Sequence, residues 1–115
     1  MSAPKPIEFR GSALDDLRAF PVGARREAGY QLDQLQQGRL PDDWKPMMAM
    51  VGSGVQEIRI PDASGAFRLL YVAKFPEAVY VLHCFQKKTQ KTNQADLQLA
   101  EQRYRDLIQE QSTVT

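Results

Sequence analysis

Alternation of apolar and polar residues predicts three consecutive strands in the second half of the chain. Residues 55–60 alternate, and the turn-forming residues 61–65 follow them. Residues 66–75 alternate again, with Arg68 and Lys74 on the same face. Residues 78–85 are apolar on both faces, as expected of a central strand. Because only short turns separate the three strands, we expect an antiparallel meander.

Apolar residues at helical spacing predict three helices. The first follows Ser12 as N-cap and is broken at Pro21, the second covers residues 22–37 with Gly38 as C-cap, and the third starts at Asn93. Their apolar faces consist of Leu14, Leu17 and Phe20, of Ala24, Ala28, Leu32 and Leu35, and of Leu97, Ala100, Tyr104 and Leu107. The first two helices should form a helical hairpin that covers the sheet.

The remaining segments complete the expected topology. Residues 7–10 alternate like a short strand, whereas the prolines and aspartates of residues 39–46 indicate a linker without regular structure. The predicted order is β-α-α-β-β-β-α. This is an α+β fold in which a small antiparallel sheet, including the N-terminal strand, carries its helices on one side. Residues 1–115 should form one domain, with flexible ends at 1–5 and 111–115.

Composition narrows the possible functions. The net charge is only +1, so a general nucleic-acid coat protein is excluded and any such contact should be confined to one face. A single cysteine, Cys84, favours a reducing compartment, and the absence of a long apolar run or signal sequence points to the cytoplasm and away from membranes. One histidine and one cysteine are too few for a zinc site, and we expect no cofactor.

The run after the central strand is the strongest indication of chemistry. Residues 78–95 contain no Asp or Glu, although the chain carries 14 acids. The cations and hydroxyls of this run are Lys87, Lys88, Thr89, Lys91 and Thr92. Such a local excess of positive charge beside a strand end is suited to an anion such as phosphate.

Four further polar residues of interest lie within the predicted strands. Arg68 has two interpretations, an internal ion pair with Glu57 across the hairpin or a guanidinium that faces an anion. Arg59 shares a strand face with Glu57. His83 shares a face with Phe85 and is either a satisfied core histidine or a group that transfers protons.

Three motifs carry a family resemblance. They are residues 57–59 (Glu-Ile-Arg), 67–71 (Phe-Arg-Leu-Leu-Tyr) and 83–92 (His-Cys-Phe-Gln-Lys-Lys-Thr-Gln-Lys-Thr). With the order of elements, they resemble the phage-derived Gp49-like branch of the RelE/HigB toxins over residues 7–108. Asn93 departs from the pattern, since many relatives have proline there.

The resemblance implies the toxin of a type II toxin–antitoxin system. Such a toxin has a RelE-like fold related to that of small microbial ribonucleases and cleaves mRNA in the ribosomal A site without a metal. It is neutralised by a separate antitoxin, here expected to be HigA-like with a helix-turn-helix. The pair represses its own promoter, so the toxin meets operator DNA only through the antitoxin.

The resemblance also implies roles for individual residues. Arg68 matches the arginine that contacts the scissile phosphate, and Arg59 falls where relatives place another cation. One of Lys87 and Lys88 would shuttle a proton to and from the RNA 2′-hydroxyl, the nucleophile. The further candidates are His83 as a second proton-transfer group, Glu57 as base or as the clamp of Arg59, and Lys91, Thr89 and Lys74 for RNA binding.

Two other functions stay open at this point. The same fold supports toxins that inhibit DNA gyrase, and a non-catalytic phage-derived module that binds RNA or the ribosome would share the basic run. Because the net charge is near zero, we expect weak or no cleavage of RNA away from the ribosome.

Overall fold

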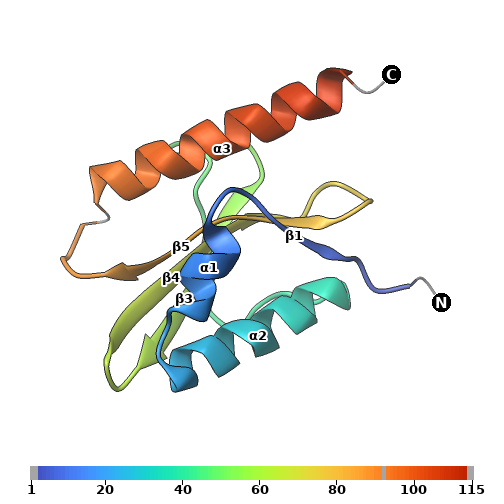
Figure 1. The fold of residues 1–115 in the computed structure, drawn as a ribbon. Helices are drawn as coiled ribbons and strands as arrows, with labels where there is room; N and C mark the ends of the chain where they lie inside the picture. Colours follow the sequence, from blue (N-terminus) through green and yellow to red (C-terminus); the bar gives the residue numbers. More distant parts are fainter. Residues whose placement is uncertain (1–2, 92, 114–115) are drawn as a thin grey trace.

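A mixed five-stranded sheet with helices on both faces forms the molecule (Figure 1). The computed structural model describes residues 3–91 and 93–113, so Thr92 of the basic run lies outside the described residues. The strands are β1 (Ile7–Phe9), β2 (Trp44–Pro46), β3 (Val55–Asp62), β4 (Gly65–Val72) and β5 (Val79–Lys87). The helices are α1 (Ala13–Arg18), α2 (Val22–Gln36) and α3 (Gln94–Thr113). The sheet order is β1-β5-β4-β3-β2.

The predicted meander of β3, β4 and β5 is confirmed, but β1 corrects the prediction of an all-antiparallel sheet. β1 pairs with β5 in parallel, with Ile7 opposite Val79. A hairpin forces its two strands to be antiparallel, whereas β1 reaches β5 only through the rest of the fold. Alternation along residues 7–10 therefore carried no information about direction.

β2 corrects the prediction of an irregular linker. Trp44 pairs with Ile58 and Pro46 with Gln56, antiparallel to β3. β2 is the last strand of the sheet, and an edge strand tolerates a proline because one side of its backbone has no partner strand. Pro46, which led to the prediction of a linker, is therefore explained by the position of β2 at the edge of the sheet.

The helices lie on both faces of the sheet, which corrects the prediction from the sequence that they lie on one side. Figure 1 shows α3 on one side and α2 on the other. Leu17 of α1, Ala28 of α2 and Leu69 of β4 belong to one core, and Ala100 and Leu107 of α3 belong to a second core. Because the central strands are apolar on both faces, each face needs a cover. The second core contains Val55, Leu70, Val72 and Leu82 from the sheet.

The ends of α2 follow its sequence closely. The helix stops one residue before the predicted end, and Gly38 follows with a φ of 80°. The N–H of Gly38 donates to the carbonyl of Leu35 and that of Arg39 to the carbonyl of Gln34, which is the Schellman arrangement. Ser12 precedes α1 as predicted, but its hydroxyl donates to the Asp16 carboxylate and caps no backbone group.

Lys5 and Gln111, in the ends expected to be flexible, make hydrogen bonds to residues far away in the sequence. The Lys5 ammonium donates to the carbonyl of Ala73 at 2.7 Å, and the Gln111 amide donates to Glu77 at 2.7 Å. α3 also continues to Thr113, past the predicted start of the flexible tail. Flexibility of the outermost residues stays a prediction.

Asn93 caps α3, and its replacement by alanine should destabilise the protein. The Asn93 side-chain oxygen accepts a hydrogen bond from the N–H of Ala95 at 2.7 Å. Loss of such a cap costs about 1 kcal/mol. Urea unfolding of Asn93→Ala should show this loss, while Gln98→Ala, on an exposed position of the same helix, should change stability little. Equal stabilities of the two variants would show that this cap contributes nothing.

Candidate functional site

The face of the sheet that α3 covers changes from apolar to charged towards the β3–β4 turn. On β3 this face continues from Val55 through Glu57 to Arg59. Arg59 stands opposite Arg68 of β4, and Arg68 stands opposite Phe85 of β5. Two arginines that the sequence placed in separate strands are therefore neighbours on one face.

Glu57 lies at the centre of this charged region, with a side chain only 1% exposed. Its Oε1 atom is 3.6 Å from Nε of Arg68, 3.7 Å from Nε of Arg59 and 3.8 Å from Nζ of Lys45. These distances exceed those of ordinary hydrogen bonds. Neither Glu57 oxygen accepts a hydrogen bond from any residue that the structure describes. We call Lys45, Glu57, Arg59 and Arg68 the cation cluster.

Both interpretations of Arg68 are compatible with this geometry. Its ion pair with Glu57 is present, yet its Nε has no hydrogen-bond partner among the described residues. Its Nη1 donates to the carbonyl of Phe67 at 3.0 Å, which fixes the guanidinium against its own strand. The side chain is 13% exposed, whereas that of Arg59 is 40% exposed.

Lys45 is a member of the cluster that sequence reasoning missed. It lies on β2, in the segment interpreted as a linker, and stands directly opposite Glu57 in the sheet. Its side chain is 37% exposed. No signal in the sequence linked it to Glu57, because the pairing depends on an edge strand that Pro46 concealed.

His83 is buried, and one of its two ring nitrogens makes a hydrogen bond. Its Nε2 is hydrogen-bonded to Oδ1 of Asp96 at 2.7 Å, which ties β5 to the first turn of α3. The ring stacks on Phe85 with centroids 5.1 Å apart, so the shared face is confirmed. Asp96 lies in the first turn of α3, where acids are common, and the sequence did not identify it as a partner of His83.

The basic run lies at the end of β5. Lys87 is half-buried opposite Ala66, and Lys88 and Thr89 are exposed beyond the strand. A pocket of about 250 Å³ is lined by Phe85, Gln86, Lys87, Lys88, Thr89, Asn93 and Asp96. Asp96, the first acid after the acid-free stretch 78–95, thus places a carboxylate beside Lys87 and Lys88. The Thr89 hydroxyl donates to the carbonyl of Lys91, which holds the loop.

Lys74 is not brought to this site. It follows β4, whereas Arg68 lies in the first half of that strand and Lys87 ends the neighbouring strand beside Ala66. Its ammonium donates to the carbonyl of Ser53 at 3.0 Å and lies over the ring of Tyr104. Lys74 is therefore at the opposite end of the sheet, and contact with RNA there stays a separate prediction.

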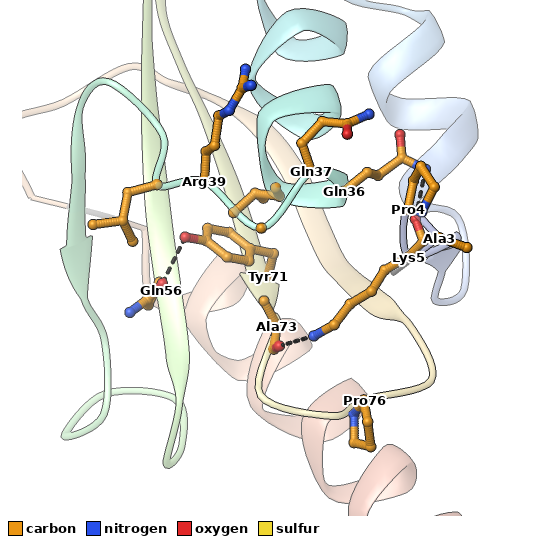
Figure 2. A pocket seen from close by; sticks show the side chains of 13 residues that line it. Ala3, Pro4, Lys5, Gln36, Gln37, Arg39, Gln56, Tyr71, Ala73 and Pro76 are labelled. Atoms are coloured by element: carbon orange, nitrogen blue, oxygen red, sulfur yellow. Dashed lines mark hydrogen bonds between the residues drawn. The ribbon is translucent and has the colours of Figure 1, made fainter. Parts of the chain in front are cut away.

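A larger pocket, of about 460 Å³, lies on the other side of the sheet (Figure 2). Figure 2 shows the Tyr71 hydroxyl directed at Gln56 and the Lys5 ammonium directed at the carbonyl of Ala73, with both hydrogen bonds formed. Burial raises the pKa of the Tyr71 hydroxyl well above its usual value, which makes it a poor proton donor. The cation cluster lies on the opposite face of the sheet, which α3 covers.

Burial raises the pKa of the Cys84 thiol to about 12, so it stays protonated and unreactive near neutral pH. No group of three histidine, cysteine or carboxylate residues in the described chain lies close enough to hold a metal ion. No helix in the part described is long and apolar enough to cross a membrane.

Comparison with known proteins confirms the predicted α+β, RelE-like fold. No curated protein matches the chain in sequence. Among solved structures, the fold is similar to that of the E. coli toxin RelE in its free state, in a variant with two arginines replaced by alanine. The TM-score is 0.57 at 13% identity, over 90% of this chain and 98% of the other. The family model described as "Phage derived protein Gp49-like" matches residues 15–105, and the chain therefore belongs to this phage-derived family.

Proposed function

We propose that this protein is the toxin of a type II toxin–antitoxin system and acts as a ribosome-dependent mRNA interferase that needs no metal. The observation that carries the proposal is the cation cluster, in which Arg59 and Arg68 lie side by side on the sheet at the end where the basic run begins. The RelE-like fold and the Gp49-like family support the proposal.

The cluster suits cleavage of RNA by its own 2′-hydroxyl. Attack of this oxygen on the adjacent phosphorus builds additional negative charge on the phosphate oxygens. Arginines remain charged at any physiological pH and present a planar fork to such oxygens. Arg59 and Arg68 would hold the phosphate and stabilise that charge as it develops.

Proton transfer is assigned to the basic run. Lys87 or Lys88 would accept the proton of the 2′-hydroxyl or donate one to the leaving 5′-oxygen. Glu57 is less suited to be the base because its side chain is 1% exposed. We assign it the role of clamp. The Nε2 atom of His83 is already hydrogen-bonded to Asp96, so His83 is a weaker candidate for proton transfer than the lysines.

The proposal also includes partners and a place of action. The net charge of +1 gives little general attraction to RNA, so the ribosome must supply much of the affinity for mRNA. The partner that controls the toxin would be a HigA-like antitoxin with a helix-turn-helix, which alone would contact operator DNA. The site of action would be the cytoplasm.

Cell-free translation with mapping of mRNA ends tests the proposal. Purified protein is added to a translating reaction and the ends are located by primer extension. We expect cuts within the translated frame that disappear when ribosomes are left out. Translation that continues unaffected, with intact mRNA, would refute the interferase and leave gyrase inhibition or a binding role to be tested by DNA supercoiling and ribosome sedimentation.

A further inference from the structure

Lys45 adds a third cation at a position that none of the family motifs includes. β2 is the edge strand of the sheet, and Lys45 stands opposite Glu57 on its neighbour β3. Its Nζ reaches to 3.8 Å from Oε1 of Glu57 while 37% of the side chain stays exposed. A lysine in this position contacts the buried carboxylate and remains accessible from solvent.

The charges of the cation cluster are not balanced. Lys45, Arg59 and Arg68 converge on a single buried carboxylate, and among the described residues their further ion-pair partner is Asp43, 3.9 Å from Arg59 and 56% exposed. Three cations against two carboxylates leave one positive charge. Because Lys45 and Arg59 are partly exposed, this residual positive charge is accessible from solvent and attracts a further anion.

An unpaired hydrogen-bond donor of the cluster also favours the binding of an anion. Arg68 Nε is a buried donor without a hydrogen-bond partner among the described residues, whereas the Glu57 oxygens, which also lack one, are acceptors that only the cations can satisfy. The contacts of the three cations with Glu57, at 3.6–3.8 Å, hold them near one point without using their donors in short hydrogen bonds. A phosphate oxygen offers the acceptors that these donors lack.

We propose that Lys45, Arg59 and Arg68 form one phosphate-binding site above the carboxylate of Glu57, and that Lys45 contacts a phosphate of bound RNA directly. Glu57 is the positioning residue of this site, since it touches the cations and not the ligand. The inference rests on the proposed function for the identity of the ligand as RNA, but the binding of a phosphate by Lys45 does not depend on cleavage.

The salt dependence of RNA binding tests the role of Lys45. A short fluorescent 2′-O-methyl RNA, which cannot be cleaved by its own 2′-oxygen, is titrated with the protein over a series of NaCl concentrations. Each phosphate contact in a single strand contributes about 0.7 to the slope of log K against log salt. We expect Lys45→Gln to reduce the slope by about 0.7, which is about fivefold weaker binding near 0.1 M salt.

Two control variants separate direct contact from other effects. Arg26→Gln removes one positive charge at an exposed position of α2, on the other side of the sheet, and should leave the slope unchanged. Lys45→Arg keeps the charge, and its slope should match that of the wild type. Melting curves of all variants establish that they are folded. Equal slopes for Lys45→Gln and Arg26→Gln, or no binding by the wild type at low salt, would overturn the inference.

The outcomes distinguish this inference from the proposed function. Binding that depends on Lys45, without any cleavage on ribosomes, would refute the interferase and retain the phosphate site. Cleavage on ribosomes with no effect of Lys45→Gln on the slope would refute the phosphate site and retain the interferase.

Discussion

Replacement of Arg68 by alanine is expected to slow mRNA cleavage on the ribosome by about 100- to 1000-fold, the usual cost of removing one group that stabilises transition-state charge. Arg68 is the least exposed of the three cations in the cluster, and its hydrogen bond to the carbonyl of Phe67 holds it in place. A group that is already positioned stabilises the developing charge without first having to reorganise. Single-turnover cleavage of mRNA on programmed ribosomes measures the effect.

The alanine variant also removes a charge beside the buried carboxylate of Glu57, so its folding must be checked. Arg68→Lys retains a cation next to Glu57 and avoids that cost, yet it loses the fork that holds two phosphate oxygens. We therefore expect Arg68→Lys to fold like the wild type and still to cleave slowly. Arg26→Lys, on α2, should retain full activity. A fully active Arg68→Lys or Arg68→Ala would remove Arg68 from the catalytic site.

The central part of the fold followed directly from local sequence. Strands β3, β4 and β5 are joined by short turns, so the alternation along β3 and β4, the apolar run of β5 and the turn residues determine both their existence and their antiparallel pairing. Pairing of β3 with β4 then places Arg59 opposite Arg68, and alternation places Glu57 on the same face. The core of the candidate site could therefore be predicted from residues 55–70 alone.

The rest of the site depends on contacts between distant segments. Lys45 joins Glu57 through an edge strand whose proline resembles a loop signal. Asp96 reaches His83 from the first turn of α3, where an acid is equally explained by the helix dipole. In both cases a local interpretation was available and plausible, and only the three-dimensional packing distinguishes it from the long-range contact.

Replacement of Glu57 by glutamine is expected to have the second largest effect, and in a way that separates binding from catalysis. Glutamine has nearly the same shape but no charge, so the three cations lose the carboxylate on which they converge. The cluster becomes more positive, and RNA should bind as tightly as to the wild type or more tightly. Misplacing catalytic groups by about 1 Å can cost on the order of 100-fold in rate, so we expect kcat to fall by about that factor.

The pH dependence of cleavage distinguishes a clamp from a general base. If Glu57 only positions the cations, Glu57→Gln lowers the rate at every pH and leaves the shape of the profile unchanged. If Glu57 is the base, the limb of the profile that reports its ionisation disappears in the variant. Glu8→Gln, at an exposed position on the opposite edge strand β1, is the matched control and should have a normal rate. Because the carboxylate is almost completely buried beneath its three cations, we expect the profile to keep its shape.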